Sequence, residues 1–281
     1  MLLSCGAHTL DLSSPVVMGV LNVTPDSFSD GGKFLDPEDA VRHARRMAAE
    51  GAAIIDVGGE STRPGAAPVE AAEEIARVIP VVGALVATLR VPVSVDTSKP
   101  EVMEAALAAG ASMINDVMAL TVPGALEVVA GSQAAICLMH MQGEPRTMQA
   151  DPRYEDVVRD VHHFLSQRVR DCETAGMERS RLVIDPGFGF GKTVEHNLRL
   201  LAALDDFARD GLPVLAGLSR KSMIGQLTGR RADERLAGSV ALAALAVAQG
   251  ASIVRAHDVA ATVDAVRIAA AMRKWRPTQG N

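Results

Sequence analysis

The sequence is poor in the residues from which disulfide frameworks, zinc sites and nucleic-acid surfaces are built. Its three cysteines, Cys5, Cys137 and Cys172, are widely separated and form no CxxC pair, which argues against both a disulfide framework and a zinc site. A single Trp, a single Tyr and a net charge of -6 provide few stacking rings and little phosphate-neutralising surface. We therefore expect a small-molecule partner, no nucleic acid, and the reducing environment of the cytoplasm.

The chain also lacks an apolar stretch of the length that spans a membrane. Its longest hydrophobic runs are broken by Gly, Asp and Pro well before the ~18 residues that a membrane helix needs. The hydrophobic content of 48% is enough for one large core. A length of 281 residues is close to the roughly 250 of a single eight-stranded α/β barrel, so the sequence predicts one soluble domain over residues 1–281.

Eight apolar runs of strand length are present, and each stops at a polar or charged residue. Helical patterns lie between them, and this alternation predicts a parallel sheet. When the strands of a (β/α)8 barrel end in polar residues, those side chains meet at one mouth and can form a site. The polar residues at or near the strand ends are Asn22, Asp56, Asp96, Asn115, Asp116, His140, Asp185, Arg220, Lys221, Arg255 and His257.

A short pattern recurs where a predicted helix gives way to the next strand. Gly51, Gly110, Gly176 and Gly250 suit the left-handed position that ends a helix, while Pro37 with two acids after it marks a helix start. An open doubly wound sheet is the alternative fold, but the GxGxxG fingerprint after the first strand is absent. The other helices are expected at about 70–89, 100–109, 124–131, 153–175, 195–205, 233–249 and 258–273.

Two glycine-rich segments follow predicted strands. In GGESTRPGA, residues 58–66, glycines bracket Thr62 and Arg63, which favours a mobile lid that carries a hydroxyl and a guanidinium over the site. The alternative is a flexible surface loop in which Arg63 is only solvated. DPGFGFGKT, residues 185–193, has Pro186 where the phosphate-loop pattern requires glycine, so we predict no nucleoside triphosphate site.

Three of the six phenylalanines, Phe28, Phe188 and Phe190, lie in strand-end loops. Core or lid packing is the ordinary role of such residues, but their number near the mouth favours an aromatic ligand.

Two carboxylates and an amide, Asp96, Asn115 and Asp185, stand at the ends of three predicted strands. Together they can pair with the N–H donors at the edge of a flat heterocycle, which indicates recognition of a ring. For each residue alone, a helix N-cap after the strand is an equal alternative.

Cations gather at the last two predicted strands. Ser219, Arg220 and Lys221 stand where a helix starts, and Arg255 and His257 end the eighth strand, in the sector of such barrels that often binds phosphate. We interpret them as an anion site, against the alternative that each cation is merely solvated and His257 structural.

Oxygen-bearing side chains follow the first strand. Asn22, with Thr24, Asp26 and Asp30, could help to hold Mg²⁺ whose remaining ligands are substrate phosphates, although an Asx-type turn explains the aspartates equally well. His140 ends a strand but has no partner visible in the sequence, so we do not assign it to the site.

These segments, in this order and over nearly the whole chain, resemble the dihydropteroate synthase family of bacterial folate biosynthesis. The resemblance implies a pterin-binding (β/α)8 barrel, a cytoplasmic homodimer and Mg²⁺ as cofactor, in a family that is the target of sulfonamides. The reaction it implies joins 6-hydroxymethyl-7,8-dihydropterin diphosphate to 4-aminobenzoate and releases diphosphate. The segments that carry the resemblance are NVTPDSFSDGG, GGESTRPGA, VSVDTSK, MINDV, MHMQGEPRTMQ, DPGFGFGK, GLSRKSMIG and VRAHDV.

The resemblance also implies a role for each matching residue. The catalytic residues are Asp96, Lys221 and Arg255. Those that hold the pterin are Asp96, Asn115, Asp185 and Lys221. Those on the diphosphate are Asn22, Arg255 and His257, with Asn22 also on the metal. Those around the aminobenzoate are Phe28, Thr62, Arg63, Pro64, Phe190 and Ser219.

The residues themselves agree with this chemistry. The sequence shows no Ser-His-Asp or Cys-His arrangement, and a diphosphate leaving group needs charge neutralisation more than a protein nucleophile. Two alternatives remain open at this stage: a methyltetrahydrofolate-dependent methyltransferase and a non-catalytic pterin-binding homologue. The chain has no room for the cobalamin domain that would accompany the methyltransferase.

Overall fold

The core of the protein is a barrel of parallel strands. The computed structural model describes residues 1–24, 37–61, 68–143 and 147–275. The strands pair in the order β8-β7-β6-β5-β4-β3-β10-β9, and a parallel bridge between Ile184 and Val214 connects the two ends of this series. The predicted (β/α)8 barrel is confirmed. Its strands are β3 (Val16–Asn22), β4 (Ala52–Gly58), β5 (Val93–Asp96), β6 (Met113–Asp116), β7 (Ala135–Met139), β8 (Leu182–Asp185), β9 (Leu215–Ala216) and β10 (Ile253–Ala256).

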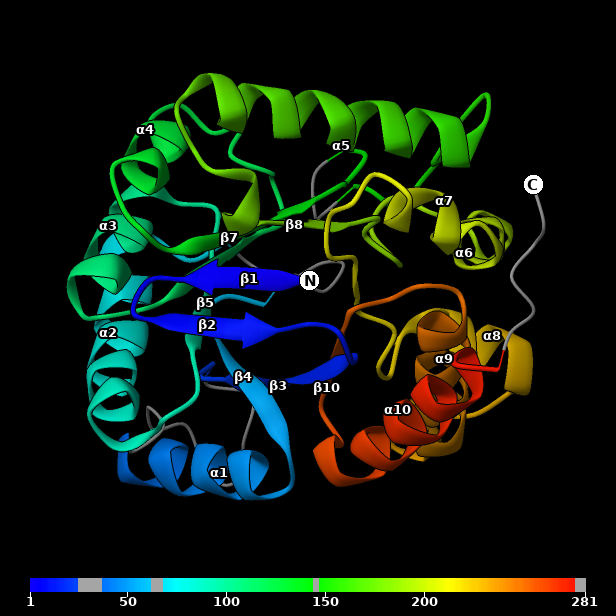
Figure 1. Ribbon diagram of the computed structural model, residues 1–281, viewed down its shortest axis with the longest axis horizontal. Helices are drawn as coiled ribbons and strands as arrows, with labels where there is room; N and C mark the ends of the chain where they lie inside the picture. The colour runs from blue at the N-terminus through cyan, green and yellow to red at the C-terminus, as the bar shows by residue number, and fades with distance from the viewer. Residues whose placement is uncertain (25–36, 62–67, 144–146, 276–281) are drawn as a thin grey trace.

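Helices form a ring around the strands (Figure 1). The predicted helix at 195–205 is in fact two, because the chain breaks at Ala203. The side chain of Asp156 accepts hydrogen bonds from the N–H groups of Val158 and Arg159, so α5 begins later than predicted. The helices are α1 (Pro37–Ala49), α2 (Ala71–Thr88), α3 (Pro100–Ala108), α4 (Ala125–Ala130), α5 (Val157–Thr174), α6 (Val194–Ala202), α7 (Leu204–Ala208), α8 (Ser222–Thr228), α9 (Leu236–Ala248) and α10 (Val259–Arg273).

An antiparallel hairpin that the sequence pattern does not predict precedes the barrel. It consists of β1 (Leu2–Cys5) and β2 (His8–Asp11), and strands of four residues are too short to show a clear alternation. The hairpin lies across the centre of the helix ring in Figure 1. Leu3 and Cys5 pack against Met18 and Ile54 in the barrel interior. The hairpin therefore closes the end of the barrel at which the strands begin.

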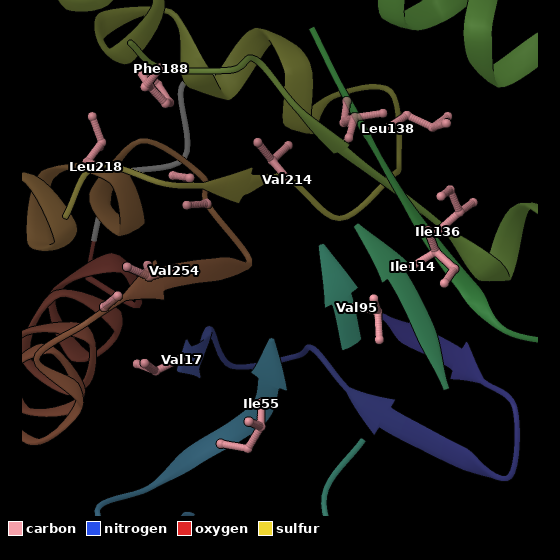
Figure 2. Close-up of a cluster of buried hydrophobic side chains, with 14 of the residues drawn as sticks. Val17, Ile55, Val95, Ile114, Ile136, Leu138, Phe188, Val214, Leu218 and Val254 are labelled. Carbon is pink, nitrogen blue, oxygen red and sulfur yellow. The ribbon is translucent and has the colours of Figure 1, made fainter. Parts of the chain in front are cut away.

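Alternation along the strands separates two cores. Val17, Ile55, Val95, Ile114 and Val254 face outward and pack in the layer between the strands and the helices (Figure 2). Residues of the opposite parity fill the interior above the hairpin. These inward residues are Met18, Ile54, Met113, Ala135, Cys137, Val183, Leu215 and Ile253.

The next inward position of several strands is polar. Because successive side chains of a strand alternate in direction, the residue two places after an inward one points inward again. Four strands thus turn Asp56, Asn115, Asp185 and Arg255 toward the barrel axis, above Ile54, Met113, Val183 and Ile253 respectively. One pleat therefore separates the apolar floor of the barrel from its polar mouth.

Glycines shape the turns around the strands. Gly51, Gly110, Gly176 and Gly250 have φ values of 105, 98, 86 and 115°, as predicted from the sequence. Gly187, in the turn after β8, has a φ of 71°, and a Cβ atom there would lie 1.9 Å from the carbonyl oxygen of His140. Only glycine fits this turn, because a side chain would be strained and would also collide with the backbone.

We predict that Gly187→Ala lowers the free energy of unfolding by at least about 2 kcal/mol, because the strain of a left-handed residue adds to the collision. Gly176→Ala is the matched control. Its φ is 86° but nothing lies within 4 Å of its Cβ position, so only strain of about 1 kcal/mol remains. Chemical denaturation of both variants measures the difference, and equal losses would contradict the close approach of the two loops.

Candidate active site at the carboxyl ends of the strands

An ion-pair network crosses the mouth of the barrel. Arg255, on β10, donates from Nε to Asp56 Oδ2 at 2.6 Å and from Nη2 to Asp96 Oδ2 at 2.7 Å. Asn115, on β6, donates from Nδ2 to the same Asp56 oxygen at 3.2 Å. Four strands thus place their terminal polar groups in one cluster, and three of the four residues are ones that the sequence predicts for the site.

Asp56 belongs to this polar cluster, but the sequence analysis did not assign it to the site. The sequence marks it as a strand end, but no spacing links it to Arg255, which follows it by 199 residues. Its side chain is fully buried, and its Oδ1 atom has no hydrogen-bond partner among the described residues. The signal that identifies it is its inward position one pleat above Ile54.

Asn22 and Asp96 lie on either side of Gly58. A Cβ atom at Gly58 would be 3.5 Å from Asn22 Oδ1 and 3.7 Å from Asp96 Cβ. The absence of a side chain at this position keeps space between the two polar groups. Asn22, predicted for the diphosphate and the metal, therefore stands next to the Arg255 network.

Asp185 and Lys221 meet the glycine-rich turn after β8. Asp185 Oδ1 accepts a hydrogen bond from the Gly187 N–H at 2.7 Å, and Lys221 Nζ lies 4.0 Å from the centre of the Phe190 ring. Such a cation–π contact fixes the direction of a lysine side chain. Phe190 is thus at the mouth as predicted, whereas Phe188 is buried in the outer core and not in the site, because it packs behind the turn.

Burial shifts the protonation equilibria of the site. It raises the pKa of Asp185 to about 6, although the Gly187 N–H and Lys221 oppose this shift. Burial also lowers the pKa of Lys221 to about 8, and the nearby Arg255 lowers it further, against the attraction of Asp185 and Asp96. The pKa of Asp96 rises for the same reason, despite its bond to Arg255. These side chains are therefore buried enough for their charges to interact strongly.

Two loops are linked above β9 and β10. Ser219 Oγ is 3.0 Å from His257 Nδ1 and accepts a hydrogen bond from the His257 N–H at 3.2 Å. Arg220, in a left-handed conformation with a φ of 57°, forms two hydrogen bonds with Asp258. Ser219, Lys221 and His257 remain at the mouth, whereas Arg220 is exposed and pairs outside it, which differs from the expectation that it faces the anion with its neighbours.

His140 has a buried partner that the sequence does not reveal. Lys192 Nζ lies 3.0 Å from His140 Nδ1 and also donates to the carbonyl oxygens of His140 and Phe190. Burial lowers the pKa of Lys192 to about 7 and that of His140 to about 3. The sequence shows no partner for His140, whereas the fold supplies one in Lys192, and the pair supports the turn that carries Phe190.

Some sequence-predicted residues cannot be placed. Phe28, Thr62, Arg63 and Pro64, together with the suggested oxygen ligands at positions 26 and 30, lie outside the described residues. All three cysteines are buried and free, as expected from their spacing.

The part of the chain that the structure describes contains no group of three or more His, Cys, Asp or Glu residues that could hold a metal ion. Asn22 offers one oxygen at the mouth, and this sparse supply suits Mg²⁺, which commonly keeps substrate phosphates and waters as its other ligands. No helix over the described ranges is long and apolar enough to span a bilayer.

Carboxylates, an amide and cations in one barrel mouth suit a flat, nitrogen-rich ring with an anionic tail. The model of the pterin binding enzyme family matches residues 18–257 of this chain. The chain is 55% identical to dihydropteroate synthase of Escherichia coli K12 over 260 residues, which are 92% of each protein.

Solved structures give the same result. Dihydropteroate synthase of Yersinia pestis, in a sulfonamide drug complex, has a TM-score of 0.93 and 51% identity, and the match covers 98% of this chain and 100% of that one. The Xanthomonas albilineans enzyme in complex with 7,8-dihydropteroate has a TM-score of 0.85 and 49% identity, with 98% and 99% covered. The chain belongs to the dihydropteroate synthase family of pterin binding enzymes. Its function is folate synthesis, and neither the methyltransferase nor the non-catalytic alternative is supported.

We predict that Asp185→Asn weakens pterin binding by about 2 kcal/mol or more, roughly 30-fold in Kd, because in the predicted pterin pocket the carboxylate would pair with two ring donors and the amide with only one. The side chain keeps its shape, and its oxygen still accepts the Gly187 N–H. Calorimetric titration with the pterin measures the loss, and thermal unfolding serves as the control for folding. An unchanged affinity would remove Asp185 from the pterin pocket.

Proposed function

We propose that this mouth joins 6-hydroxymethyl-7,8-dihydropterin diphosphate to 4-aminobenzoate, giving 7,8-dihydropteroate and diphosphate. The observation that carries the proposal is the placement of Arg255 between the carboxylates of Asp56 and Asp96. Asn115 forms a hydrogen bond with Asp56. This arrangement combines acceptors for ring N–H groups with a cation for the phosphorylated tail. The Xanthomonas albilineans relative, solved with 7,8-dihydropteroate, supports the product.

The pterin lies deepest in this proposal. Asp96, Asn115 and Asp185 occupy inward positions directly above the apolar floor, where they accept and donate hydrogen bonds along the ring edge. Lys221, held over Phe190, stands at the side of the same pocket. The diphosphate lies further out, beside Arg255, His257 and Asn22, because His257 follows Arg255 by two residues and lies just past the end of β10.

Charge neutralisation drives the chemical step. The bond between the pterin methylene carbon and the diphosphate oxygen breaks early, and its electron pair leaves with the diphosphate. Arg255 and Lys221 stabilise the departing oxygen, while Asp96 and Asp185 stabilise the positive charge that develops on the pterin. The amine of 4-aminobenzoate then forms the C–N bond and loses its proton to water.

Asn22 would hold Mg²⁺, which when bound would add to the neutralisation of the diphosphate. Its Oδ1 atom would share the ion with oxygens of the diphosphate. The side chain of Asn22 stands beside Gly58, whose missing side chain leaves room between Asn22 and Asp96.

The aminobenzoate enters above the pterin. Phe190 offers a ring face and Ser219 a hydroxyl at this level, and Phe28, Thr62, Arg63 and Pro64 complete the proposed site. Ser219, on the proposed aminobenzoate site, contacts His257, on the proposed diphosphate site. The two sites are therefore adjacent. We expect 4-aminobenzoate to bind poorly until the pterin and diphosphate sites are filled.

A homodimer in the cytoplasm is the proposed working form. Large apolar side chains are exposed on one side of the helix ring, on α9 and α10, which pack against each other. Ile268 is 72% exposed and Met272 and Leu245 about half exposed, which is costly for a monomer and suits an interface between two copies. The free buried thiols suit the reducing cytoplasm.

We predict that diphosphate is released from the pterin diphosphate only when both 4-aminobenzoate and Mg²⁺ are present. A phosphate-coupled assay measures the release, and omission of each component in turn provides the controls. Release without 4-aminobenzoate would indicate hydrolysis, and no release under any condition would refute the proposed reaction. Firm binding of 4-aminobenzoate to the enzyme alone would refute the proposed order.

We predict that Ile268→Glu converts the dimer into a monomer, because it places a charge in the apolar contact. Sedimentation velocity should show the mass fall from twice the chain mass of 29.5 kDa to that mass. Val86→Glu is the matched control, since Val86 is also exposed but lies on α2, away from this face (Figure 1). A dimer that survives Ile268→Glu would exclude the α9–α10 face.

A further inference from the structure

We propose that Asp56 is a positioning residue for Arg255. Asp56 holds the guanidinium through Nε, while the Nη2 edge gives up its bond to Asp96 and binds the diphosphate. The inference rests on the proposed function and deepens it, because it assigns the residue that keeps Arg255, the cation that binds the diphosphate, in place. In this structure the inner bond, from Nε to Asp56, is 2.6 Å, and the outer bond, from Nη2 to Asp96, is 2.7 Å.

The two bonds differ in their access to the mouth. The Asp56 side chain is 0% exposed, whereas those of Asp96 and Arg255 are 13% and 22% exposed. A ligand that enters the mouth therefore reaches the outer pair first. The pterin ring donors compete for Asp96, while the bond to Asp56 stays beyond their reach.

The chemistry of the guanidinium permits such an exchange. It carries five N–H donors in a rigid plane, of which only one is needed to keep the bond with Asp56. When the pterin ring binds Asp96, the Nη2 edge of Arg255 becomes available to the diphosphate, while the Nε bond to Asp56 is kept. Burial lowers the pKa of Arg255, but Asp56 and Asp96 outweigh this effect, so the group stays charged throughout.

A purely structural role explains Asp56 poorly. Both of its hydrogen bonds, from Arg255 and Asn115, end on Oδ2, and Oδ1 has no partner among the described residues. A buried ion pair seldom adds stability over a well-packed apolar pair, and an unpaired buried acceptor is a further cost. The arrangement is understandable if the carboxylate serves to hold a charged side chain in one place.

The arrangement of the bonds also provides a conservative variant. In Asp56→Asn the amide oxygen can take the place of Oδ2 and the NH₂ group that of Oδ1. The variant keeps both bonds and loses only the charge, whereas Asp56→Ala loses the bonds as well. Asp116→Asn is the control for the loss of a buried carboxylate, because Asp116 is equally buried; both of its oxygens accept backbone N–H groups, of Met118 and Leu120, so the amide also loses one bond there, outside the mouth.

The test compares the Kd of 6-hydroxymethyl-7,8-dihydropterin with that of its diphosphate by titration calorimetry. Asp56→Asn should weaken the diphosphate form by about tenfold and the bare pterin by less than about threefold, and Asp56→Ala should weaken the diphosphate form more. In an Arg255→Ala background, Asp56→Asn should cause less than about a twofold further loss, because it acts through Arg255. Asp116→Asn should leave the ratio of the two Kd values unchanged.

Two results would overturn the inference. One is an equal loss for both ligands in the Asp56 variants, which would indicate a general structural role. The other is the same loss from Asp56→Asn with and without Arg255, which would show that the two residues act independently. A wild-type protein that binds neither ligand would instead refute the proposed function, so the two failures are distinguishable.

Discussion

One guanidinium organises the mouth of this barrel. Arg255 joins β10 to β4 and β5 through hydrogen bonds to Asp56 and Asp96, and Asn115 adds β6 to the same oxygen. Two carboxylates so close together would repel each other in a dry environment, and the cation between them compensates that repulsion. The proposed pocket for the ring, the orientation of the Asn115 amide and the proposed cation for the leaving group all depend on this arrangement.

The rest of the site follows from strand geometry and from one supported turn. A single pleat changes the barrel interior from Met113 and Val183 to Asn115 and Asp185, so the depth at which a ring is recognised is set by the alternation of the backbone. The turn after β8 adds the ring of Phe190 beside Lys221 and is supported from behind by Lys192 and His140. Polar recognition and aromatic contact are thereby brought to the same level.

The sequence predicted the barrel because eight apolar runs alternate with helical patterns, and it predicted most of the polar cluster at the mouth because polar residues end those runs. Asp185 and Arg255 could be found in this way. Asp56 could not be linked to Arg255, nor His140 to Lys192, because each pair is distant in sequence and its contact depends on strand register and turn geometry. The hairpin β1–β2 was missed since its four-residue strands carry too weak a pattern.

That hairpin has a consequence for the traffic of ligands. Because Leu3 and Cys5 fill the end of the barrel where the strands begin, the floor beneath the proposed pterin pocket is sealed with side chains. A molecule bound on that floor enters and leaves through the end of the barrel at which the strands end. The innermost component must arrive first and depart last, so the architecture imposes a sequence of events that no individual catalytic group encodes.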